Sequence, residues 1–169
     1  MWPHKFEPDP TRVPVIEASG MVLFARSTQR IGITHRSIHV QGGNCWGTIG
    51  GVMEPRALPR ESAIRELLEE TGYSGEIDLY LAYIFSSRQL RYYNYVGVVP
   101  QEFFLDPNCQ HIWENDELRW FALDDLLHLI ERQPGTFHFG LRRLMNNARD
   151  LIERLALGKS PSIEWFRSP

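Results

Sequence analysis

The sequence lacks features that mark several classes of protein. Its 169 residues include only two cysteines, Cys45 and Cys109, and these form no CxxC pair. No uninterrupted apolar run approaches the roughly 18 to 20 residues that a membrane span needs. The N-terminus shows no secretory signal pattern. We therefore expect a cytoplasmic protein without disulfides that does not act in a membrane.

A basic excess is also missing. Lysine and arginine number 18 against 21 aspartates and glutamates, which gives a formal net charge of −3. Proteins that bind duplex nucleic acid neutralise its phosphates with many lysines and arginines. We therefore expect no duplex partner, and a small phosphorylated ligand that local features of the protein bind.

The chain is long enough to bury one core and too short for two ordinary domains. Four prolines among the first 14 residues favour extended backbone. We predict an N-terminal arm over residues 1–17, one folded domain over residues 18–158 that includes a C-terminal helix, and a tail over residues 159–169.

The predicted domain contains both strands and helices. Hydrophobic periodicity and turn residues predict two hairpins, one further strand and three helices. The predicted strands are Ser19–Ala25, Ile31–His35, Leu79–Phe85, Leu90–Val99 and Leu118–Phe121, and the helices are Pro59–Thr71, Asp124–Glu131 and Phe139–Leu157. The last helix carries a broad apolar stripe, which packs in the chain's own core or, alternatively, forms a homodimer.

The helix predicted over Pro59–Thr71 carries an unusual group of charges. Its apolar residues are expected on one face, and Glu66, Glu69 and Glu70 at positions i, i+3 and i+4 on the other. Like charges one turn apart repel each other, and a cation would relieve that repulsion. A solvated glutamate face would explain the pattern equally well, but Gly50 and Gly51 lie just upstream, where glycine backbone can approach a ligand.

These residues resemble a known motif. The motif combines a glycine, a loop and an Arg-Glu-aliphatic-x-Glu-Glu-x-Gly-aliphatic helix. The matching residues are Gly51, Arg65, Glu66, Leu67, Glu69, Glu70, Gly72 and Tyr73. The segment resembles the Nudix box. The resemblance implies an α/β fold, with a mixed β-sheet sandwiched between α-helices. It also implies hydrolysis of a pyrophosphate bond in a nucleoside diphosphate derivative.

The resemblance also implies roles for particular residues. Glu66 and Glu70 are expected to bind Mg²⁺, or alternatively Mn²⁺, together with Glu69 and the Gly50 carbonyl. Arg65 is expected to orient these carboxylates, and Glu69 is also a candidate for catalysis. A further glutamate from a loop outside the box serves as base in many relatives, and in the segment 114–117 we favour Glu114 over its acidic neighbours Asp116 and Glu117.

One position departs from the motif. Ala57 stands where the family has a glutamate that commonly pairs with the box arginine. We expect Glu54 or Glu61 to pair with Arg65 in its place. The departure also leaves open a non-catalytic module that binds a nucleotide without cleaving it.

Aromatic residues suggest where the rest of a substrate would bind. Strand alternation places Tyr93 and Tyr95 on one face and Tyr92 on the other. We predict that Tyr93 and Tyr95 stack a base, although core packing would also explain them. His111, with the other downstream histidines, has no recognisable partner, and nothing in the sequence chooses among nucleotide sugars, nucleoside triphosphates, dinucleoside polyphosphates and ADP-ribose.

Overall fold

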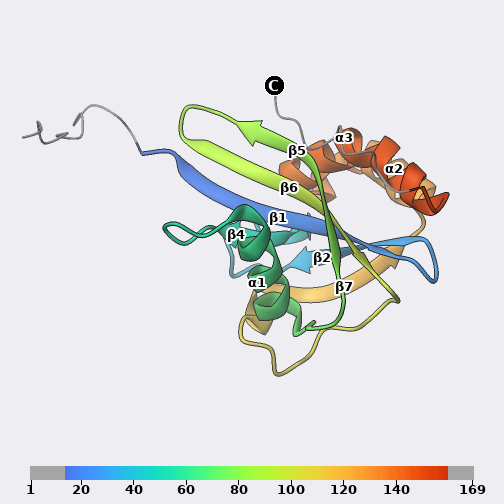
Figure 1. Cartoon of the computed structure of the whole chain (residues 1–169), viewed down its shortest axis with the longest axis horizontal. Helices are drawn as coiled ribbons and strands as arrows, with labels where there is room; N and C mark the ends of the chain where they lie inside the picture. The colour runs from blue at the N-terminus through green and yellow to red at the C-terminus, as the bar shows by residue number, and fades with distance from the viewer. Residues whose placement is uncertain (1–13, 160–169) are drawn as a thin grey trace, which may run out of the picture.

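The computed structural model describes residues 14–159, so most of the predicted arm and tail lies outside the described residues. The fold is a seven-stranded mixed sheet with helices on both faces (Figure 1). This architecture confirms the predicted α/β fold.

Strand β1 (Ile16–Ala25) lies at the centre of the sheet. It pairs antiparallel with β2 (Arg30–Arg36), which completes the first predicted hairpin. On its other edge it pairs parallel, over ten residues, with β6 (Leu90–Val99). Strand β6 then pairs antiparallel with β5 (Asp78–Ser86), which completes the second predicted hairpin.

Three further strands complete the sheet. Strand β4 (Ile49–Val52) pairs with the N-terminal half of β1, because β2 pairs with the C-terminal half. Strands β3 (Cys45–Gly47) and β7 (Asn115–Phe121) both pair with β2. A 3₁₀ turn (Ile112–Glu114) leads directly into β7.

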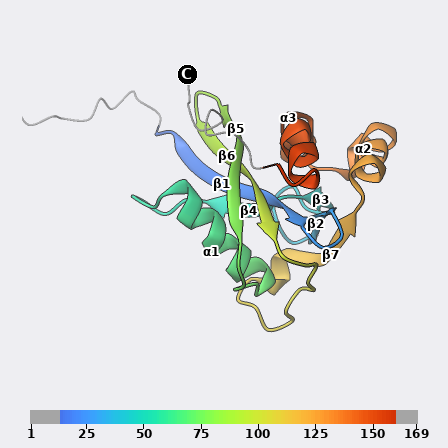
Figure 2. The same cartoon turned by 45° about the vertical axis from the view of Figure 1, so that its right-hand side comes forward.

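The helices divide between the two faces of the sheet (Figure 2). Helix α1 (Pro59–Thr71) packs on one face with a core cluster that includes Ala63 and Leu67. Helices α2 (Leu123–Arg132) and α3 (Phe139–Ala156) pack on the other face with a second cluster. Among the described residues, none of the helices has the length and hydrophobicity that a membrane span requires.

The apolar stripe of α3 is buried inside the chain. All seven apolar residues of the stripe have exposed fractions of 7% or less in the single chain, and all belong to the cluster under α2 and α3. The stripe therefore packs in the chain's own core and offers no surface for the alternative homodimer.

Helix α1 begins at Pro59 and ends at Gly72, as predicted. Gly72 adopts the left-handed conformation (φ 77°), and its N–H donates to the Leu68 carbonyl, which caps the helix. The prediction of which residues face inward was correct for Ala63 and Leu67 but wrong for two other apolar residues and two glutamates. Ile64 and Leu68 are exposed, whereas Glu66 and Glu70 are only 8% and 1% exposed. The glutamates point inward because the glycine-rich strand β4 and Asn115 offer them space and hydrogen-bond donors.

Candidate functional site

Glu70 is held in the interior by two hydrogen bonds. The Gly50 backbone N–H donates to its Oε1 atom at 2.8 Å, and the Asn115 amide Nδ2 donates to its Oε2 atom at 2.5 Å. Burial raises the pKa of Glu70 to about 8, although these two donors oppose the shift. The side chain is therefore a positioned carboxyl group, fixed between strand β4 and the start of β7.

Gly50 can adopt the backbone conformation that this site requires because it has no side chain. Its φ of 153° is unusual for other residues, and a Cβ there would lie 2.3 Å from the Ser19 carbonyl oxygen. The predicted contact of the Gly50 carbonyl with a metal remains a prediction. The contact that the structure shows is made by the Gly50 amide, which orients Glu70.

Glu66 lies against the next glycine of β4. A Cβ on Gly51 would come within 2.9 Å of the Glu66 carboxylate, so the glycine provides the space that this side chain fills. Burial raises the pKa of Glu66, the Arg65 charge opposes this, and the charges of Glu69 and Glu114 add to it. Gly51 thus leaves space for Glu66, and its neighbour Gly50 donates a hydrogen bond to Glu70.

Arg65 pairs with the glutamates of its own helix. Its Nη2 atom lies 2.7 Å from Glu66 Oε1 and its Nη1 atom lies 2.8 Å from Glu69 Oε2. The expectation that Glu54 or Glu61 replaces the missing partner at Ala57 was wrong, since neither forms an ion pair with Arg65 in the described part of the chain. Partial burial lowers the pKa of Arg65, and the carboxylates of Glu66, Glu69 and, more weakly, Glu54 raise it by more.

The loop before β7 brings two further groups to the glutamates. His111 Nδ1 lies 3.7 Å from Glu69 Oε2 and 3.5 Å from Glu114 Oε1. Glu114 is close enough that its charge acts on both Glu66 and Glu70. The structure therefore brings Glu114 to the helix carboxylates, whereas Glu117 forms an ion pair with Arg119 and Asp116 lies beside His35. The sequence contained no signal for the role of His111.

The donor set fits a divalent cation. Glu66, Glu69 and His111 each have one ligand atom within 4.8 Å of the others, and Glu70 and Glu114 lie close enough to interact electrostatically with Glu66. Arg65 is the one side chain of permanent positive charge that forms ion pairs with these carboxylates among the described residues. The Nδ1 atom of His111 is buried and has no hydrogen-bond partner in the described chain. Carboxylate oxygens are the preferred ligands of Mg²⁺ and Mn²⁺. A bound cation would offset the repulsion among the buried glutamates.

A cavity of about 230 Å³ adjoins this cluster on the α3 side of the sheet. Gly50, whose N–H donates to Glu70, is one of its lining residues, and aromatic side chains from β5, β6 and the start of α3 form its walls. Arg143 lies over the rings of Phe85 and Phe139, with Cζ 5.0 Å and 5.4 Å from their centroids. The cavity is thus an aromatic pocket with an arginine at its wall.

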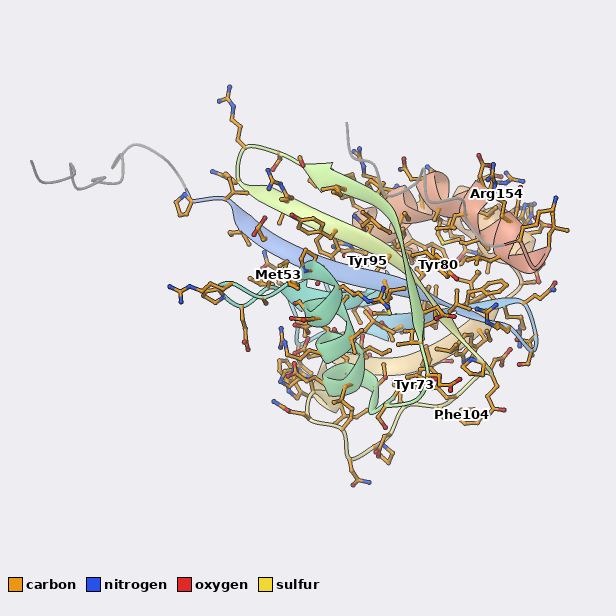
Figure 3. All side chains as sticks on the ribbon, in the orientation of Figure 1. Met53, Tyr73, Tyr80, Tyr95, Phe104 and Arg154 are labelled. Atoms are coloured by element: carbon orange, nitrogen blue, oxygen red, sulfur yellow. The ribbon has the colours of Figure 1, made fainter. Side chains whose placement is uncertain are left out.

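The tyrosines predicted to bind substrate face away from this cavity. Tyr95 is 8% exposed and lies on the α1 side of the sheet, where Tyr93 also packs, whereas Tyr80 lies on the α3 side; Figure 3 labels Tyr95 and Tyr80. Tyr92, whose side chain lies on the other face of the sheet, lines the cavity. The alternation was predicted correctly, but alternation does not show which face of a sheet carries a cavity. Stacking of a base on Tyr93 and Tyr95 therefore remains a prediction, and the cavity is on the face that carries Tyr92.

The raised pKa of Glu70 predicts how stability depends on pH. Between the ordinary glutamate pKa of 4.5 and about 8, the unfolded chain releases this proton and the folded chain keeps it. The free energy of unfolding of the metal-free protein should therefore fall as pH rises through this range. In Glu70→Gln this part of the fall should be absent, because the amide does not titrate.

Urea denaturation in the presence of a chelator, at a series of pH values, measures this effect. Glu61→Gln is the matched control, because Glu61 is an exposed glutamate of the same helix and should keep the wild-type pH dependence. Equal pH dependence in Glu70→Gln and wild type would contradict the assignment.

Two relatives of this chain are both named as diphosphoinositol polyphosphate phosphohydrolases. The chain is 24% identical over 117 residues to diphosphoinositol polyphosphate phosphohydrolase 3-alpha of Mus musculus, over 69% of this chain and 65% of that protein. It is 26% identical over 117 residues to diphosphoinositol polyphosphate phosphohydrolase 2 of Homo sapiens, over 69% of this chain and 58% of that protein. The chain thus matches less than two thirds of the length of these relatives.

Solved structures share the fold. A mutT/nudix family protein from Listeria innocua aligns with a TM-score of 0.63 at 20% identity, over 88% of this chain and all of the other (100%). A NUDIX hydrolase from Nitrosomonas europaea aligns with a TM-score of 0.58 at 17% identity, over 92% and 97% of the two chains. At this identity the likeness concerns the fold.

A family model, described as the NUDIX domain, matches residues 15–144. The matched range contains β1, the whole of α1 and the loop with His111 and Glu114, so it includes every group placed at the acidic cluster. Because the match covers well over half of the sequence, the chain belongs to the Nudix family.

Proposed function

We propose that this protein is a hydrolase dependent on Mg²⁺ or Mn²⁺ that cleaves a pyrophosphate bond in a nucleoside diphosphate derivative. The observation that carries the proposal is the position of Gly50. Its amide orients Glu70 in the acidic cluster, and the same residue lines the aromatic cavity. A ligand that fills the cavity would therefore extend its phosphates toward the carboxylates.

We assign different roles in the reaction to different residues of the chain. Glu66, Glu69 and Glu70 would hold the cation, and Arg65 fixes the first two in place through its hydrogen bonds. When bound, the cation supplies charge neutralisation on the phosphate oxygens and lowers the pKa of the attacking water. Glu114, half-buried beside the cluster, is assigned the role of base that accepts a proton from this water.

The cavity supports a nucleoside as the organic part of the substrate. The rings of Phe85 and Phe139 offer flat apolar surface, on which a base can stack. An inositol polyphosphate, the substrate class in the names of the curated relatives, has no such ring and would require many cations around it. This cavity has two arginines in its wall, Arg36 and Arg143, and the chain has a net charge of −3.

Ala57 keeps a second candidate function open, a module that binds nucleotides without cleaving them. The contacts of Arg65 argue for catalysis, because Glu66 and Glu69 themselves provide the counter-charges that Ala57 does not. A binding module also gains nothing from burying repelling glutamates.

A substrate panel tests the proposal. Nucleotide sugars, ADP-ribose, dinucleoside polyphosphates, nucleoside triphosphates and a diphosphoinositol polyphosphate are incubated with the protein and Mg²⁺ or Mn²⁺ in water enriched in heavy oxygen. We expect at least one nucleoside compound to be cleaved, with solvent oxygen in one phosphate product and no turnover in chelator.

Each other result has a defined meaning. Cleavage of the diphosphoinositol compound alone would overturn the nucleoside assignment and keep the hydrolase. Thermal stabilisation by nucleotides without any cleavage would replace the hydrolase by the binding module, since a ligand that binds only the folded state raises its apparent stability.

A further inference from the structure

His111 is fixed beside α1 by its backbone. Its N–H donates to the Glu69 carbonyl at 2.7 Å, and its own carbonyl accepts from the Glu114 N–H at 2.9 Å. The first bond joins the loop before β7 to the end of the helix that carries the glutamates. The imidazole therefore lies next to the Glu69 carboxylate because the backbone holds it there.

The ring nitrogen of His111 that faces this cluster has no partner. Nδ1 is buried, and although carboxylate oxygens lie 3.5 Å and 3.7 Å away, it forms no hydrogen bond within the described chain. Buried polar atoms in folded proteins almost always have a partner. A buried nitrogen with a lone pair, placed against two carboxylates, has the chemistry of a metal ligand.

Distances within the cluster agree with this role. One ligand atom each from Glu66, Glu69 and His111 can be chosen so that all three lie within 4.8 Å of one another. Ligands on opposite sides of a cation with bonds of about 2.1 Å are separated by about 4.2 Å. Only one pair among three ligands can lie on opposite sides, and adjacent ligands are about 3 Å apart, so side-chain movements of about an ångström would bring all three atoms into one coordination shell.

We propose that His111 is a nitrogen ligand of the cation held by Glu66 and Glu69, so that the site binds Co²⁺ and Zn²⁺ more tightly than its carboxylates alone would. The inference rests on the metal site of the proposed function. Imidazole nitrogen binds Zn²⁺ and the later transition metals well, whereas Mg²⁺ is bound by oxygen ligands and water. Loss of the imidazole should therefore affect the two kinds of metal unequally.

The test measures metal binding to the untagged full chain without substrate. Calorimetric titrations with Co²⁺ and with Mg²⁺ compare wild type with His111→Gln. We expect Co²⁺ affinity to fall by about 10- to 100-fold in the variant and Mg²⁺ affinity to change little. The visible absorption of bound Co²⁺, which reports on its ligands, should change as well.

Two variants serve as controls. His128→Gln removes an exposed histidine from α2, on the opposite face of the sheet, and should bind Co²⁺ as wild type does. Glu66→Gln should weaken binding of both metals. If Glu66→Gln weakens both while His111→Gln matches wild type, the role of His111 is overturned and the metal site is retained.

A further measurement uses only the wild-type protein, so its result does not depend on whether a variant folds. In protein labelled with heavy nitrogen, addition of Zn²⁺ should shift the resonance of His111 Nδ1 strongly, and an unshifted resonance in the zinc-bound protein would overturn the proposal. Binding without hydrolysis of any compound in the panel would overturn the proposed function alone. A wild-type chain that binds no divalent cation would overturn both.

Discussion

Glu66→Gln is expected to lower the rate of pyrophosphate hydrolysis by about a hundredfold or more. A metal ion contributes several kcal/mol of charge stabilisation in such reactions, and each ~1.4 kcal/mol changes the rate tenfold. The glutamine has nearly the same size as the glutamate, so it fits the space beside Gly51 and removes mainly the charge. Without metal, the variant should be at least as stable as wild type, because a buried charge is lost.

Steady-state kinetics under saturating Mg²⁺ and thermal melting in chelator measure the two effects. Glu61→Gln is again the matched control, since it removes the same charge from an exposed position of the same helix. Wild-type turnover in Glu66→Gln would remove Glu66 from the metal site. A large fall in the melting temperature would assign it a structural role instead.

Gly50→Ala is expected to destabilise the fold by on the order of 3 kcal/mol, through backbone strain and overpacking. The new Cβ would lie 2.3 Å from the Ser19 carbonyl oxygen and 2.4 Å from the Gly20 Cα, and these backbone atoms belong to the central strand. Activity should fall too, because relief of the clash moves the amide that holds Glu70.

Urea denaturation measures the loss of stability. The control is Gly135→Ala, because a Cβ on Gly135 would have no atom within 4 Å and its backbone is not in the left-handed region. That variant should differ from wild type by less than about 0.5 kcal/mol. An equally small effect of Gly50→Ala would show that β4 shifts without cost.

The local elements of this fold could be predicted from the sequence because their signals are local. The spacing of apolar residues, Pro59 and Gly72 determine where α1 begins and ends, and turn residues separate the strands of both hairpins. The parallel pairing of β1 with β6 was not predicted, because it joins segments that only the folded chain brings together. The same limit applies to the contact of His111 with Glu69, which lies on α1, far from His111 in the sequence.

Which residues form the candidate site was predicted better than how they are arranged. Glu66, Glu69, Glu70 and Glu114 do converge. Glu66 and Glu70 are buried, however, although helical periodicity predicted that the glutamates would face outward. Such reasoning assumes that charged residues face solvent, and a site built for a cation reverses this assumption. Places where simple pattern rules fail are often functional.

The central parallel pair has a consequence for how the protein folds. Glu17 of β1 and Arg91 of β6, which form an ion pair across the two strands, are 74 residues apart in the sequence. Long loops must close before such contacts form, so pairing at this separation slows folding. Helix α1 lies inside that loop and packs on β1 and β4. During synthesis, a chain that has emerged only as far as α1 contains every glutamate of the motif. It still lacks β6, the parallel partner of β1, and Asn115 at the start of β7, so we expect the metal site to form late.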